Sequence, residues 1–121
     1  MSYDIRLTDP VTGEDIEFDT PHAMRGGTYQ VGGTTRAWLN ITYNYSKYYY
    51  DALPETKEKG IRTIYGMTGA DSIPLLERMT ATLSGETDSN YWKATPGNAK
   101  RPLLQLIAMA KRRPDGIWKG D

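Results

Sequence analysis

A group of cationic, aromatic and amide side chains has the composition of a small-nucleotide site. The candidates are Arg25, Arg36, Arg62, Lys100 and Arg101 for phosphate, Tyr91 and Trp92 for a base, and Asn98 for a base or ribose edge. A guanidinium offers phosphate a planar fork of donors, and a loop aromatic can stack on a base. The alternative interpretation is that the aromatics anchor their loop and the arginines are solvated.

The sequence contains no recognisable catalytic constellation. His22 is the only histidine, in a loop beside Pro21, so a nucleophile triad or a common zinc site has one imidazole available. The acidic residues are scattered and do not form the carboxylate pair of a glycosidase-type hydrolase. We therefore expect a non-enzymatic protein without a metal or cofactor, and a small hydrolase remains an alternative.

A glycine-rich segment, Gly66 to Ser72, precedes a predicted helix. Free backbone N–H groups at a helix N-terminus can bind phosphate, but the segment lacks the Gly-Lys-Ser/Thr signature of a P-loop. The simpler interpretation is a turn capped by Asp71 or Ser72.

Charge and composition restrict the class of partner. Fifteen basic and fifteen acidic residues give a net charge of zero, which argues against long nucleic acid or an anionic membrane as the partner. Near-neutral charge together with nine tyrosines and three tryptophans favours self-association. We expect a homo-oligomer.

The compartment is predicted from cysteine content and hydropathy. The chain has no cysteine, which excludes disulfides and thiolate zinc sites. No apolar stretch is long enough to span a membrane, and the polar N-terminus lacks a signal-peptide core. The expected location is the cytoplasm, and the 121 residues fit a single domain.

Strand-like alternation dominates the N-terminal half. Residues 3–7 and 16–18 alternate around an Asp9-Pro10 turn and predict a hairpin. Residues 29–31 and 34–43 flank Gly32-Gly33 and predict a second hairpin. The outer face of the strand at 34–43 carries Arg36, Trp38, Asn40 and Thr42.

Helical spacing replaces alternation after Asn44. Apolar residues predict helices over 45–53, from 71 or 72 to about 84, and from Pro96 or Pro102 to Arg113. The apolar stripe of the last helix is expected to include Leu103, Leu104 and Ile107. The fold class is therefore α+β, with an N-terminal antiparallel sheet followed by C-terminal helices.

Several segments between residues 28 and 121 resemble small phage and prophage accessory proteins. They are Asn40 to Asn44, Gly60 to Arg62, Tyr65 to Gly69, Tyr91-Trp92, Gly97 to Lys100, and Pro114 to Trp118. The chain is also similar to the Thoeris anti-defence sponge proteins of phages. That family is oligomeric and sequesters cyclic ADP-ribose signals without cleaving them, and some members also bind cyclic oligonucleotides.

The resemblance implies an arginine, an aromatic ring, an asparagine and a late arginine around the ligand. In this sequence Arg62, Tyr91 or Trp92, Asn98, and Arg112 or Arg113 match those roles by order and type. The family's pocket aromatic is a phenylalanine, whereas the one phenylalanine here is Phe18. The implied function is sequestration of a small nucleotide immune signal in an infected bacterial host. The alternative is a protein-binding inhibitor of a host defence system, such as an anti-CRISPR, or another phage accessory factor.

Overall fold

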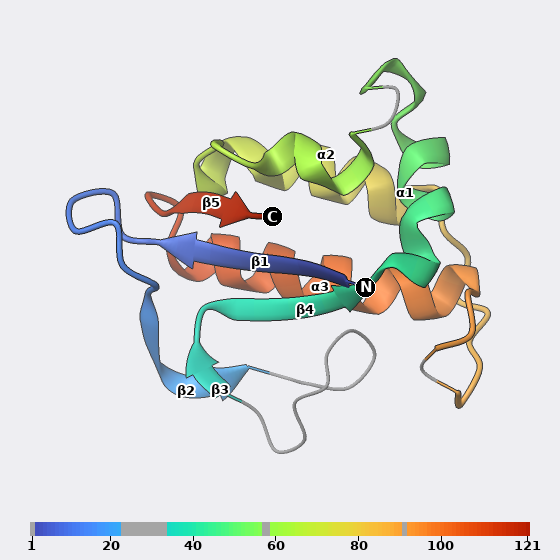
Figure 1. Ribbon diagram of the computed structural model, residues 1–121, viewed down its shortest axis with the longest axis horizontal. Coiled ribbons are helices and arrows are strands. Elements are labelled where there is room, and N and C mark those ends of the chain that lie inside the picture. The colour runs from blue at the N-terminus through green and yellow to red at the C-terminus, as the bar shows by residue number, and fades with distance from the viewer. Residues whose placement is uncertain (1, 23–33, 57–58, 91) are drawn as a thin grey trace.

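A three-stranded antiparallel sheet backed by two long helices forms the centre of the fold in the computed structural model (Figure 1). The structure describes residues 2–22, 34–56, 59–90 and 92–121. The sheet has the order β4-β1-β5, from β1 (Ser2–Thr8), β4 (Trp38–Thr42) and β5 (Ile117–Gly120). A separate two-stranded sheet joins β2 (Glu17–His22) to β3 (Thr34–Arg36).

One face of the main sheet packs on the helices and the other is open. Alternate residues of β1, namely Tyr3, Ile5 and Leu7, are fully buried. The residues between them, Asp4 and Arg6, are exposed. In Figure 1 the helix α3 (Pro96–Arg112) lies behind the sheet, and α2 (Gly69–Ala81) runs beside it, above β5. The predicted α+β class, with an N-terminal antiparallel sheet and C-terminal helices, is confirmed.

The predicted N-terminal hairpin forms at its turn but does not continue along the strands. Both edges of β1 are occupied, by β4 and by β5, so β2 cannot pair with it along its length. Near the turn, an isolated bridge joins Thr8 to Asp15, and Ile16 N donates to Leu7 O at 3.0 Å. Beyond it, β2 pairs with β3 instead. Of the second predicted hairpin, residues 29–31 and Gly32-Gly33 lie outside the described residues.

The predicted strand at 34–43 is divided at Ala37. The Ala37 N–H donates to Ile16 O at 2.8 Å, and its carbonyl accepts from Leu7 N at 2.9 Å. These bonds turn the chain from the small sheet into the main sheet. Of the predicted outer face, Arg36 on β3 is exposed and Trp38 on β4 is half-buried, whereas Asn40 and Thr42 are buried.

The connector between the sheet and α2 is helical. A 3-10 turn, η1 (Tyr43–Tyr45), leads into α1 (Ser46–Ala52), which confirms the helix predicted there. Two further 3-10 turns follow, η2 (Pro54–Thr56) and η3 (Gly60–Ile64). Ile61 and Ile64 of η3 are fully buried, so this connector packs against the core.

The two long helices begin at threonine caps. Thr68 Oγ1 accepts from Asp71 N and starts α2, so the predicted caps at Asp71 and Ser72 are wrong by three or four residues. Thr95 Oγ1 accepts from Asn98 N and starts α3 at Pro96. Proline suits this first position because its missing N–H would have no partner there.

The buried stripe of α3 differs at one predicted position. Leu103 and Leu106 are fully buried and Ile107 is nearly so, whereas Leu104 is 49% exposed. A 3.6-residue period cannot place both 103 and 104 at the centre of one face. Leu104 therefore lies at the solvent side of the helix.

The strand β5 was not predicted, because four residues are too few for alternation to show. Its Trp118 is fully buried and donates from Nε1 to Ser72 Oγ at 2.8 Å. Trp118 N also donates to Met67 O at 2.9 Å, and Gly66 N donates to Trp118 O at 2.8 Å. The C-terminal segment is thereby tied to the start of α2 and completes the sheet beside β1.

Candidate functional site

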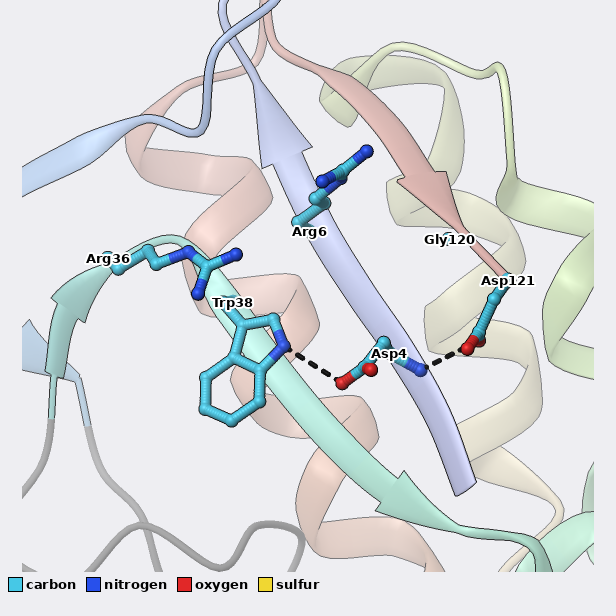
Figure 2. Close-up of a pocket in the computed structure, with 6 residues that line it drawn as sticks. All are labelled: Asp4, Arg6, Arg36, Trp38, Gly120 and Asp121. Atoms are coloured by element: carbon cyan, nitrogen blue, oxygen red, sulfur yellow. Dashed lines mark hydrogen bonds between the residues drawn. The ribbon is translucent and has the colours of Figure 1, made fainter. Parts of the chain in front are cut away.

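The open face of the main sheet contains a hollow of about 390 Å³ (Figure 2). Six residues line it: Asp4, Arg6, Arg36, Trp38, Gly120 and Asp121. The volume lies within the range of about 300–1,000 Å³ that is usual for small-molecule sites. The lining combines cations, carboxylates and one aromatic ring.

The carboxylate of Asp4 organises the centre of the hollow. Its Oδ1 accepts from Trp38 Nε1 at 3.0 Å and from Asn40 Nδ2 at 3.1 Å. Its backbone N–H donates to Asp121 Oδ1 at 3.0 Å. Figure 2 shows the indole and the Asp121 carboxylate pointing toward Asp4 from opposite sides. The indole edge is thus fixed by a hydrogen bond on the sheet surface.

Asn40 extends this polar network beneath the surface. Its Nδ2 also donates to Ser2 Oγ at 2.8 Å. Its Oδ1 is buried and has no hydrogen-bond partner within the described part of the chain.

One carboxylate, that of Asp15, faces two guanidinium groups. Asp15 Oδ2 accepts from Arg36 Nε in a short ion pair, and Arg6 Nε lies 3.7 Å from Asp15 Oδ1. The Arg6 side chain is 48% exposed and that of Arg36 is 45% exposed. Two guanidinium groups thus meet one carboxylate at this end of the hollow, whose lining also includes the carboxylates of Asp4 and Asp121. Lys119 lies opposite Arg6 in the sheet register.

Arg36 also lies over the indole of Trp38. Its Cζ is 5.5 Å from the ring centroid, within the range of a cation–π contact. The pair brings a guanidinium cation and a planar ring into the same wall of the hollow (Figure 2). The residues that line the hollow therefore include arginine donors for an anion, an indole ring for stacking, and carboxylate acceptors for hydroxyl or amine groups.

The predicted site residues are not all gathered in one place. Of the six that the structure describes, Arg36 alone lines the hollow. Arg25 and Tyr91 lie outside the described residues. Arg62 is adjacent to the hollow, because its Nε donates to the main-chain oxygen of the last residue, Asp121, at 3.0 Å.

Arg62 is surrounded by tyrosines. Its Nη2 donates to the hydroxyl of Tyr43 at 2.9 Å, and its Cζ lies 4.8 Å from the Tyr3 ring centroid. Burial alone would lower the pKa of Arg62, but the neighbouring phenols of Tyr43 and Tyr3 raise it. Burial raises the pKa of Tyr3 to about 12, so both partners keep their ordinary protonation states near neutral pH.

The Asn98 side chain has a structural role, because it hydrogen-bonds the loop before α3. Its Oδ1 accepts from Asp88 N at 3.2 Å, and its Nδ2 donates to Asn90 O at 3.1 Å and to Lys93 O at 3.0 Å. The side chain is almost fully buried. Both amide donors are therefore committed to the loop before α3, away from the lining of the hollow.

Trp92 belongs to the loop that Asn98 holds. Its ring is partly exposed at 45%, and its carbonyl oxygen accepts from Asn44 Nδ2 at 2.8 Å. The Tyr48 hydroxyl donates to Ala94 O at 3.2 Å. These contacts attach the loop to α1 and η1 and do not bring Trp92 into the hollow.

The two late arginines lie near the C-terminus of α3. Arg112 lies over the Phe18 ring at 4.0 Å and contacts Thr20 Oγ1 at 3.4 Å. Arg113 pairs with Asp115 Oδ2 at 2.9 Å and Asp9 Oδ2 at 3.3 Å. Neither residue lines the hollow.

Sequence reasoning did not select Asp4, Arg6, Trp38, Gly120 or Asp121 as site residues. A signal was present for the first two, because they alternate with Tyr3, Ile5 and Leu7 and so share the polar face of a strand. No local pattern connects Asp121 to Asp4, since they become neighbours only through the pairing of β5 with β1.

Comparisons with protein-family models, curated proteins and solved structures found no match. Among residues 2–22, 34–56, 59–90 and 92–121, no group of three or more His, Cys, Asp or Glu side chains is placed to hold a metal ion. Within the same ranges, no helix has the length and apolar character needed to cross a membrane.

Proposed function

We propose that this protein binds a small nucleotide in the hollow of the open sheet face and holds it without cleaving it. The observation that carries the proposal is the Arg36–Trp38 pair, in which a guanidinium lies over an indole whose edge is fixed by Asp4. Arg36 and Arg6 would contact phosphate, and Trp38 would offer its ring to a base. Asp4 and Asp121 would accept from ribose hydroxyls.

The biological role in this proposal is anti-defence sequestration by a phage protein. Its support is the resemblance to sponge proteins together with the ligand chemistry of the hollow. The ligand class is cyclic ADP-ribose or a cyclic oligonucleotide, in the cytoplasm of an infected bacterium. The alternative, a protein-binding inhibitor, would favour a contiguous apolar patch. However, the exposed large apolar residues of the described ranges are Val11, Trp92 and Leu104. The turn at 9–14 and the start of α3 lie at opposite ends of the molecule in Figure 1.

Equilibrium dialysis tests binding and cleavage together. Cyclic ADP-ribose or AMP is mixed with protein in excess, the free ligand is measured, and the protein is then denatured by heat. We expect the free ligand to be depleted and then returned intact, as judged by mass spectrometry. Recovery of a linear or shortened product would instead establish a hydrolase. Absence of depletion with every nucleotide would contradict the proposal.

Two tryptophan variants locate the site. Trp38→Ala removes the ring from the hollow, and loss of a stacking contact costs about 1–3 kcal/mol, roughly ten- to a hundred-fold in affinity. Trp92→Ala is the matched control and should bind as well as the wild type. If Trp92→Ala weakened binding and Trp38→Ala did not, the ligand would bind at the loop before α3, as the resemblance implies.

We also propose that the protein is a homo-oligomer. Support comes from the zero net charge and the abundance of tyrosine. Light scattering at micromolar concentration should give a mass of at least three chains. A stable monomer of 13.6 kDa would contradict this part of the proposal.

A further inference from the structure

The helix α3 carries four basic residues and no acidic residue. They are Lys100, Arg101, Lys111 and Arg112, and the other residues of this 17-residue helix are uncharged. Of the fifteen basic and fifteen acidic residues in the chain, α3 thus holds four and none, which leaves a net charge of −4 on the remaining residues. The charge of this neutral protein is therefore unevenly distributed, and α3 is its positive part.

The four cations border an apolar strip on the exposed side of α3. Leu104 and Ala108 form the strip, and both are exposed, Leu104 at 49%. Because successive helix residues are about 100° apart, the two lysines lie along one border of the strip and the two arginines along the other. Arg101 and Arg112 lie at opposite ends of the strip, about 16 Å apart at a rise of 1.5 Å per residue.

The described part of the chain supplies no carboxylate partner to these four cations. The ion pairs within it involve other basic residues, among them Arg36, Arg78 and Arg113. Arg112 contacts the Phe18 ring and Thr20 Oγ1, which are neutral groups. The positive charge of the exposed α3 face is therefore not neutralised by a direct ion pair in this part of the protein.

Helix stability accounts for only half of this pattern. Lys111 and Arg112 lie in the last turn of α3, where cations complement the negative end of the helix dipole. Lys100 and Arg101 lie near the opposite, positive end, where the dipole gives a cation no stabilisation. Of the exposed large apolar residues in the described ranges, Leu104 alone belongs to a helix. A pair of cations and a leucine thus remain on this surface without a role in the fold.

The chemistry of the α3 face favours an acidic protein segment over a nucleic acid. Glutamate or aspartate side chains complement the cations at the two ends, and an apolar side chain between them can cover Leu104. An extended segment spans the 16 Å between the ends with about five residues. A nucleic-acid strand would find no aromatic ring on α3 on which a base could stack, and the apolar strip would interrupt its phosphate contacts.

We infer that the exposed face of α3 is a docking surface for an acidic protein segment, in which two acidic clusters flank an apolar residue. The surface is separate from the hollow. Leu103 and Leu106 bury the opposite side of α3 in the core, and α3 lies behind the sheet in Figure 1, whereas the hollow is on the open face of the sheet. The inference therefore goes beyond nucleotide binding and does not depend on it.

Fluorescence anisotropy with a labelled synthetic peptide tests this inference. The peptide carries two pairs of glutamates separated by a short segment with a central leucine, and it is titrated with the full-length protein. We expect saturable binding that weakens as the salt concentration rises. The double variant Arg101→Gln/Lys111→Gln should weaken binding at least about five-fold, through the loss of two exposed ion pairs. Leu104→Ala should weaken it at least about two-fold, through the loss of apolar contact.

A second double variant, Lys59→Gln/Lys119→Gln, is the matched control. It removes the same charge at two exposed lysines outside α3 and should bind the peptide as tightly as the wild type. Thermal unfolding midpoints confirm that all variants are folded. Equal losses in the two double variants would reduce the binding to general charge attraction and overturn the inference. Absence of binding to the wild type would also overturn it, as would tighter binding of a labelled oligothymidylate that the α3 variants abolish.

Discussion

The carboxamide of Asn98 makes three hydrogen bonds to the loop before α3, although its residue type and position suit base recognition equally well. The sequence alone cannot show whether Asn98 holds the loop or recognises a base, because both roles need a polar side chain near a helix N-terminus. The structure distinguishes the two roles, because the Asn98 amide is buried and both of its donors are paired, which leaves no donor for a ligand. Trp38 is the opposite case: its sequence context is an ordinary strand, but its ring borders a polar hollow.

Asn98→Ala should lower the free energy of unfolding by about 1–3 kcal/mol, because buried loop groups lose their partners. Denaturation with urea measures this loss. Asn98→Asp is a useful comparison, because it keeps the acceptor for Asp88 N and removes both donors. A variant with wild-type stability but no nucleotide binding would show that Asn98 reads the ligand.

At the scale of elements, the start of α2 packs closely against the end of α3. A Cβ added to Gly69 would lie 2.8 Å from Arg113 O and 3.2 Å from Ala110 O. Both are backbone atoms, so neither can move away without shifting a helix. The close contact between α2 and α3 therefore requires a residue without a side chain at position 69.

Gly69→Ala should destabilise the protein by about 1–3 kcal/mol through this overlap. Gly85→Ala is the matched control, since a Cβ there meets nothing within 4 Å. Thermal unfolding of the two variants should differ by several degrees. Equal midpoints would show that the two helices are not in close contact at Gly69.

The turn after β1 is organised by charge. Asp9 Oδ1 accepts from Val11 N at 2.8 Å and Thr12 N at 3.1 Å. Hydrogen bonds from Thr12 and Val11, followed by Arg113, lower the pKa of Asp9. A lowered carboxyl pKa stabilises the folded state above the unfolded-state pKa, and that stabilisation is lost as pH falls through the folded-state value.

Stability should therefore decrease below about pH 4, the ordinary aspartate range. Asp9→Asn removes this titration and should show a lower unfolding midpoint at pH 7 with a shallower decrease at acid pH. Melting curves at pH 7 and pH 3 measure both effects. Parallel curves for wild type and variant would show that Asp9 does not contribute.

At the scale of the whole molecule, the fold class could be predicted because long periodic segments dominate the chain. The alternation of Tyr3, Ile5 and Leu7 and the helical stripes both survive in the core. The pairing of strands could not be predicted, since β1 contacts β5 across more than 100 residues. For the same reason the hollow could be anticipated only in part: Arg36 and Trp38 share a predicted strand face, whereas Asp121 reaches the site through β5.

The central claim is that a nucleotide binds beside Trp38 on the open sheet face. The indole N–H signals of Trp38, Trp92 and Trp118 can be followed separately in ¹H–¹⁵N spectra, with assignments from single Trp→Phe variants. Titration with AMP should shift the Trp38 signal, whose N–H is bonded to Asp4, and leave the buried Trp118 signal in place. A stationary Trp38 signal, whether or not Trp92 moves, would contradict the claim.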